Sequence, residues 1–180
     1  KLYDSCWIDD WYQSADQREE YYKKGKEIIA TVYHEHEKNA RIPLMLEGWF
    51  KIAVGNYFLN GRIDRIDRLP DGSLEIIDYK TGQAKDKLSS EDKEQLLIYQ
   101  IAAEQVPEYR HQGKTSKLTF YYLNDNVKIS FLGTAEELSG LKEKLVEIID
   151  RIRAQDFTPA PSSFICGHCD FRSICEFRAS

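Results

Sequence analysis

The chain has 180 residues, a length that suits one domain with a sizeable hydrophobic core, so we expect a single domain over residues 1–180. No apolar run approaches the roughly 18 residues of a membrane span and no signal peptide is visible, which argues against a membrane or secreted protein. The formal net charge of −5 argues against nucleic-acid binding, unless basic residues cluster or bound cations neutralise carboxylates.

The first half of the chain predicts one helix followed by three strands. Helical periodicity runs from Ala15 to about Lys38, and Pro43 ends it. Its apolar stripe consists of Tyr21, Ile28, Ile29, Val32 and Tyr33. Alternating and β-rich runs then predict strands over 44–54, 57–69 and 73–80.

The second half predicts a helix, two strands and a long helix. Ser90 is a plausible N-cap for a helix that ends near Val106. Strands are expected over 117–123 and 127–132, and Thr134 with Glu137 forms a capping-box signature for a helix to about Ala154. This order of elements predicts an α/β fold with a mixed sheet flanked by helices.

The stretch from Gly61 to Gly82 carries the strongest chemical signal. With Pro70, Asp71 and Gly72 as a three-residue hairpin loop, Leu69 faces Ser73, and Asp64 then lies across from Asp78. Period-two alternation would place Arg62, Asp64 and Ile66 on one face of the second strand, and Ile76, Asp78 and Lys80 on one face of the third.

Facing residues on one side of a sheet have Cβ atoms roughly 5 Å apart, so two aspartates there repel each other. A divalent cation between Asp64 and Asp78 would relieve this repulsion, with Lys80 beside Asp78. The alternative is a surface hairpin with cross-strand Asp–Arg pairs, for which Arg65 and two neighbouring arginines are available, and Asp67 is interpreted as such a structural partner.

The motif Gly61-Arg62-Ile63-Asp64, followed by Asp78-Tyr79-Lys80, resembles the active site of the PD-(D/E)xK nuclease superfamily, and most closely its RecB-like branch. The resemblance implies a restriction-endonuclease-like core in which Asp64 and Asp78 bind Mg²⁺ or Mn²⁺ and Lys80 assists the attacking water. It also suggests the backbone carbonyl of Tyr79 as a metal ligand.

Three further residues gain a possible role from the same resemblance. Glu47 lies in the first strand, where family members often carry a glutamate near the site, although an exposed strand glutamate is the alternative. Gln95 and Tyr99 lie four residues apart on one helix face, like a Gln…Tyr pair that positions DNA in this branch. Simple packing of Tyr99 is the alternative.

Three of the four cysteines lie close together in a tail over 164–178. Cys166, Cys169 and Cys175 have spacings that suit soft metals or iron–sulfur clusters, which indicates a reducing compartment, and we expect a cytoplasmic protein. The tail resembles those of AddB-type and CRISPR-adaptation-type nucleases, which implies a [4Fe–4S] cluster. Cys6 is a tentative fourth ligand, and a zinc site completed by His168 is the alternative.

The chain begins at Lys1 and has a single methionine, so we expect it to be a piece of a longer protein, with a histidine and the fourth cluster cysteine lying upstream. The function predicted is metal-dependent DNA hydrolysis, as an exonuclease module in DNA repair or recombination, with a helicase domain or subunit as a possible partner. A nuclease fold that binds DNA or acts as a scaffold without cutting is one alternative. A CRISPR spacer-adaptation nuclease is another.

Overall fold

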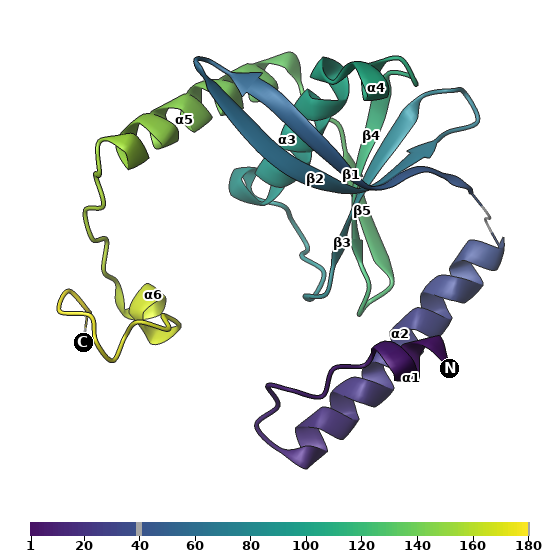
Figure 1. Ribbon diagram of the computed structural model, residues 1–180, viewed down its shortest axis with the longest axis horizontal. Helices are drawn as coiled ribbons and strands as arrows, with labels where there is room; N and C mark the ends of the chain where they lie inside the picture. The colour runs from purple at the N-terminus through teal and green to yellow at the C-terminus, as the bar shows by residue number, and fades with distance from the viewer. Residues whose placement is uncertain (39–40, 180) are drawn as a thin grey trace.

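The fold is built on one mixed five-stranded sheet (Figure 1). The computed structural model describes residues 1–38 and 41–179. The strands follow chain order in the sheet, with β3 and β4 parallel and every other neighbouring pair antiparallel. Their bounds are β1 Pro43–Val54, β2 Tyr57–Arg68, β3 Leu74–Lys80, β4 Thr115–Tyr122 and β5 Val127–Phe131. The predicted mixed sheet is confirmed.

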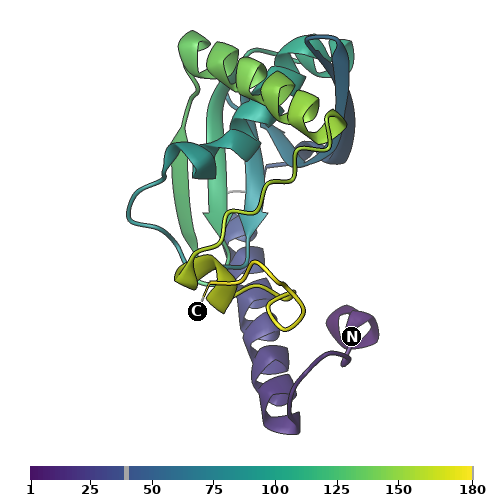
Figure 2. The same ribbon diagram turned by 90° about the vertical axis from the view of Figure 1, so that its left-hand side faces the viewer.

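Of the described helices, α3 and α5 pack against one face of this sheet. Their bounds are α1 Leu2–Cys6, α2 Ala15–Lys38, α3 Ser90–Gln105, α4 Pro107–Arg110, α5 Ala135–Arg153 and α6 Ser163–Gly167. The crossover helix α3 contacts β1, β3 and β4, and α5 contacts α3 and β1 (Figures 1 and 2). None of the described helices is both long enough and apolar enough to traverse a lipid bilayer.

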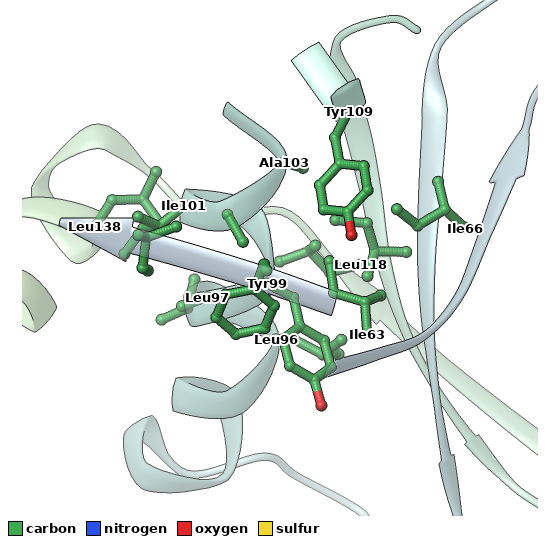
Figure 3. Close-up of a cluster of buried hydrophobic side chains, with 14 of the residues drawn as sticks. Ile63, Ile66, Leu96, Leu97, Tyr99, Ile101, Ala103, Tyr109, Leu118 and Leu138 are labelled. Carbon is green, nitrogen blue, oxygen red and sulfur yellow. The ribbon is translucent and has the colours of Figure 1, made fainter. Parts of the chain in front are cut away.

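The hydrophobic core lies between the sheet and α3. Figure 3 shows Ile63 and Ile66 of β2 facing Leu96 of α3 and Leu118 of β4, and all four side chains are at most 1% exposed. Full burial of each such side chain contributes roughly 1.5–3 kcal/mol. This packing fixes α3 relative to β2 and β3, the two strands that carry the aspartates of interest.

The β2–β3 hairpin has the predicted register. Leu69 N donates to Ser73 O at 2.8 Å, and Gly72 adopts a φ of +84°, a conformation that glycine accepts at little cost. Arg65 then pairs with Ile77, and continuing that register places Asp64 opposite Asp78.

The prediction that Arg62, Asp64 and Ile66 share one face of β2 is wrong. Ile63 and Ile66 both point into the core, whereas the Arg62 side chain is 47% exposed. The cause lies in β1, where Glu47 has a φ of +51° and the ladder pairs on either side of it omit the Glu47–Asp64 position. The alternation of β2 therefore shifts at Asp64.

The predicted helix starts are confirmed, with one correction at α3. Its N-cap is Ser89 rather than Ser90, because the Ser89 hydroxyl accepts from Asp92 N while the Asp92 carboxylate accepts from Ser89 N. The predicted capping box of Thr134 and Glu137 opens α5.

The terminal segments lie apart from the core. The predicted bounds of α2 are confirmed, but none of its residues is buried, and Tyr21, Ile29 and Tyr33 of its apolar stripe are each more than half exposed. In Figure 1, α1 and α2 lie on one side of the molecule and α6 with the C-terminal tail lies on the other.

Candidate active site

Asp78 lies in the central strand β3 with only 2% of its surface exposed. Burial raises the pKa of this carboxyl above its ordinary value, because the charged form loses hydration. The nearby Lys80 ammonium counteracts this effect, and the charge of Asp64 adds to it. Asp78 is thus a buried acid held beside a second acid and one cation.

Asp64 reaches Asp78 through the irregularity in β2. Its Oδ2 atom accepts a hydrogen bond from Tyr79 N at 3.0 Å, directly after Asp78 in β3. This bond and the strand register together place the Asp64 carboxylate beside that of Asp78, and the charge of Asp64 contributes to the raised pKa of Asp78. The predicted convergence therefore occurs, although simple alternation does not produce it.

Lys80 joins the acids to α3. Its Nζ atom lies 2.7 Å from Asp78 Oδ2 and donates to Gln95 Oε1 at 2.6 Å. Gln95 Nε2 in turn donates to the Tyr99 hydroxyl at 3.0 Å. One continuous polar chain thus links Asp78, Lys80, Gln95 and Tyr99, which are four of the residues singled out by sequence.

Tyr99 is 7% exposed and packs its ring edge-on against Phe50. The packing expected as the alternative role of Tyr99 is therefore present. Burial raises the pKa of its hydroxyl, the hydrogen bond from Gln95 lowers it, and the charges of Asp78, Asp64 and Glu47 raise it further. The ring therefore belongs to the core, while the hydroxyl accepts from Gln95 at the polar side of the site.

Glu47 occupies the irregular position of β1 across from Asp64, and its side chain is 63% exposed. Its Oε2 atom accepts a hydrogen bond from Arg62 Nη1 at 3.2 Å. The structure thus places Glu47 at the margin of the site, paired with an arginine.

The acidic pair provides the donor type that a hard divalent cation requires. Asp78 Oδ2 is buried and makes no well-aligned hydrogen bond, despite its ion pair with Lys80. Mg²⁺ commonly uses one or two carboxylates together with water and substrate phosphate. Asp64 and Asp78 fit that requirement, while the described part of the chain gathers no three His, Cys, Asp or Glu side chains into a metal-holding group.

The cysteines of the tail are only partly organised. Cys166 is 8% exposed and its Sγ accepts from Ala179 N at 3.3 Å, while Cys169 and Cys175 are half-buried. Cys6 is exposed on α1, across the molecule from α6 in Figure 1. The structure does not bring Cys6 to the other three.

A second buried polar cluster lies on the opposite face of β2 and β3. Arg65 donates to both carboxylate oxygens of Asp67, at 2.7 and 2.8 Å, and to the Tyr79 hydroxyl at 3.2 Å, which confirms the structural role expected for Asp67. Sequence reasoning missed Glu75, which binds Arg41 and Lys117. The signal was its place between the core residues Leu74 and Ile76, in a strand buried on both faces.

Comparison with known proteins identifies the family of this chain. The model of the PD-(D/E)XK nuclease superfamily matches residues 1–176, and the chain belongs to that superfamily. Its members are nucleases and usually use Mg²⁺ or Mn²⁺. The crystal structure of SSO0001 is similar at 18% identity, covering 86% of this chain and 70% of that chain with a TM-score of 0.48. A comparison with curated proteins gives no match.

Proposed function

We propose that this chain is a Mg²⁺- or Mn²⁺-dependent deoxyribonuclease that acts as an exonuclease module in DNA repair or recombination. The observation that carries the proposal is the meeting of two carboxylates and one ammonium, from Asp64, Asp78 and Lys80, beside the crossover helix. Superfamily membership supports hydrolysis of phosphodiester bonds.

Asp64 and Asp78 are the proposed metal ligands, with the backbone carbonyl of Tyr79 as a further one. When bound, the cation would lower the pKa of a coordinated water and stabilise negative charge on the scissile phosphate. The Tyr79 amide holds Asp64 in place, so the hydrogen bond at 3.0 Å fixes one ligand against the strand that carries the other.

Lys80 is proposed to orient the attacking water and to offset phosphate charge. Its contacts to Asp78 and Gln95 hold the ammonium at the edge of the acidic pair. Gln95 and Tyr99 position DNA in this proposal, because the Gln95 amide connects Lys80 to the Tyr99 hydroxyl beside the site.

The tail cysteines are proposed to hold a [4Fe–4S] cluster with a structural role. Cys166, Cys169 and Cys175 keep the spacing of such ligands, and the burial of Cys166 gives one sulfur an anchored position. Zinc bound with His168 is the alternative. We further propose that a helicase domain or subunit accompanies the chain.

The decisive experiment compares the protein with a Lys80→Ala variant, using Mn²⁺ and a mixture of supercoiled and linear DNA. We expect the variant to cut about 10²- to 10³-fold more slowly, the loss typical of removing one group that stabilises transition-state charge. Lys24→Ala, on the exposed surface of α2, is the matched control and should cut normally. Exonuclease action predicts loss of the linear DNA with the closed circles intact.

A second candidate is a nuclease-fold module that binds DNA or serves as a scaffold without cutting. The observation that favours it is the pairing of two acidic side chains with basic ones, Asp78 with Lys80 and Glu47 with Arg62. Equal signal from the protein and from Lys80→Ala would remove the nuclease proposal and leave this one. CRISPR spacer adaptation would share the chemistry of the first proposal and differ in partners.

A further inference from the structure

The β1–β2 hairpin carries aromatic rings and cations on its solvent-facing side. Trp49 and Phe58 are each 66% exposed. Aromatic side chains of this size are usually buried in the core or in an interface. Arg62 lies over the Trp49 ring at 4.7 Å, and Lys51 lies over the Phe58 ring at 4.5 Å. We name this set the hairpin ladder, which consists of Trp49, Lys51, Phe58, Asn60 and Arg62.

The strand register arranges the hairpin ladder in three successive rows. Trp49 pairs with Arg62, Lys51 with Asn60, and Ala53 with Phe58. Because each strand residue rises about 3.3 Å, the first and third rows are roughly 13 Å apart. At the roughly 3.4 Å spacing of stacked nucleotides in one DNA strand, this distance corresponds to about four nucleotides.

The hairpin ladder begins beside the acidic site. Arg62 precedes Asp64 by two residues in β2 and donates to Glu47, which occupies the position of β1 across from Asp64. Arg62 and Asp64 lie on different faces of β2, so a strand of DNA that leaves the site would pass the edge strand β1 at Glu47 and then meet the Trp49–Arg62 row.

The local charge differs from that of the whole molecule. The chain is acidic overall, with a net charge of −5. Along the hairpin ladder the charged side chains are the cations Lys51 and Arg62, and two acids lie beside it, Glu47 at the end nearest the site and Glu108 in a hollow next to Trp49. Beside Trp49 an open hollow of about 580 Å³ extends from Lys51 and Asn60 to Val106 and Pro107. It offers room for a base next to the indole.

We propose that the hairpin ladder binds single-stranded nucleic acid that extends from the active site, with bases on Trp49 and Phe58 and phosphates on Lys51 and Arg62. Unpaired bases have free faces that stack on aromatic side chains, and phosphates bind the adjacent cations. A duplex lacks those free faces. The inference rests on the proposed nuclease function for the direction of the strand, but not for binding itself.

The test measures binding of a fluorescent oligothymidine to the full chain in EDTA, so that cleavage plays no part. Each base–aromatic stack is worth enough that Trp49→Ala and Phe58→Ala should each weaken binding about 5- to 100-fold. Trp49→Tyr keeps a ring and should retain most of the affinity. Trp11→Ala removes a 96% exposed tryptophan elsewhere and should bind like the unmodified protein.

Salt dependence tests the cations separately. Lys51→Gln should lower the slope of log affinity against log salt by about 0.7, the value of one phosphate contact on a single strand. Lys24→Gln on α2 is the control and should leave the slope unchanged. A blunt duplex should bind more weakly than oligothymidine and should be insensitive to Trp49→Ala.

Several outcomes would overturn the inference. These are oligothymidine binding that is unchanged in both Trp49→Ala and Phe58→Ala, no binding by the unmodified protein, or an oligomer that these substitutions dissociate without altering binding. The outcomes separate the two proposals. Binding through the hairpin ladder without Mn²⁺-dependent cleavage would overturn the nuclease proposal alone. Mn²⁺-dependent cleavage together with normal oligothymidine binding by Trp49→Ala and Phe58→Ala would overturn the ladder proposal alone.

Discussion

The fold disfavours the ionised form of the Asp78 carboxyl. Its carboxyl is 2% exposed in the central strand, and burial and the neighbouring Asp64 both raise its pKa, with Lys80 acting in the opposite direction. A group whose pKa is higher in the folded protein destabilises that state when ionised, at every pH above its unfolded value. Neutral pH lies above that value, so the ionised Asp78 lowers the free energy of unfolding of the metal-free protein.

Asp78→Asn should therefore stabilise the metal-free protein at neutral pH by about 1 kcal/mol, which is typical when a functional constraint is released. It should also abolish cleavage if Asp78 is a ligand. Thermal unfolding in EDTA measures the gain, which should shrink as the pH falls through the raised folded pKa and should vanish below the unfolded value of 3.8.

Asp86→Asn, at an exposed position after β3, is the control and should leave the unfolding temperature unchanged. A less stable Asp78→Asn protein at neutral pH would show that the ion pair with Lys80 outweighs the desolvation of the carboxylate.

Glu47 combines backbone strain with a place beside the site. Its φ of +51° costs a residue with a Cβ roughly 1–2 kcal/mol, and glycine avoids that cost. We therefore expect Glu47→Gly to be about 1 kcal/mol more stable than Glu47→Ala, as measured by urea unfolding.

The two Glu47 substitutions also remove the same carboxylate, so their activities separate strain from chemistry. Loss of cleavage in both would make Glu47 part of the site, and normal cleavage in both would leave it an exposed strand residue. Equal stability would contradict the left-handed conformation.

At the scale of the strands, local patterns predicted the register of the β2–β3 hairpin but not which β2 side chains share a face. The loop residues Pro70, Asp71 and Gly72 determine the register because Gly72 can accept a positive φ. The change of face at Asp64 originates in the neighbouring strand, at Glu47, and no alternation within β2 reports it. The sequence thus predicted that Asp64 and Asp78 lie close together, but it predicted the wrong alternation of side chains along β2.

Across β2, β3 and β4, the face opposite α3 is held together by buried charge. Glu75 is 4% exposed and accepts hydrogen bonds from Thr119 at 2.7 Å and Arg41 at 2.9 Å, with Lys117 at 3.0 Å. Burial opposes ionisation of Glu75, but the hydrogen bonds from Thr119 and Lys117 prevail and its pKa is lowered. This cluster is built for the ionised carboxylate.

Glu75→Gln should lower the free energy of unfolding by about 2 kcal/mol at neutral pH, because hydrogen bonds to a charged group are lost in a buried place. A lowered folded pKa means that the stabilisation is complete above the unfolded value of 4.5 and disappears as the pH falls through the folded pKa. Urea unfolding across this range should show the two proteins converging in acid.

Glu20→Gln, at an exposed position of α2, is the control for this comparison and should match the unmodified protein throughout. A difference between Glu75→Gln and the unmodified protein that stays constant into acid would show that packing, rather than charge, is responsible.

At the scale of the whole molecule, the two chain ends lie on opposite sides of the sheet. If the tail holds an iron–sulfur cluster, Cys169→Ser should remove most visible absorption from anaerobically purified protein. Cys6→Ser should keep it, because Cys6 lies on α1 away from α6. Loss of colour in both variants would place Cys6 among the ligands, and colourless protein with stoichiometric zinc would favour the zinc site.

The order and type of the main elements could be predicted because each carries its own local signal. The capping box at Thr134, the proline and glycine turns and the alternating strands need no knowledge of the rest of the fold. The exposure of the α2 stripe and the separation of Cys6 from Cys166 depend on how distant segments pack, which no local pattern encodes.

The parallel pairing of β3 with β4 governs the order in which the molecule can assemble. The β2–β3 hairpin joins residues close in the chain, whereas β4 returns to β3 only after α3 has crossed the sheet. Long-range pairing of this kind is slow, because the chain loses the entropy of loop closure before the stabilising contacts form. Lys80 meets Gln95 only when that crossover docks, so a newly made chain completes the candidate site only at the end of folding.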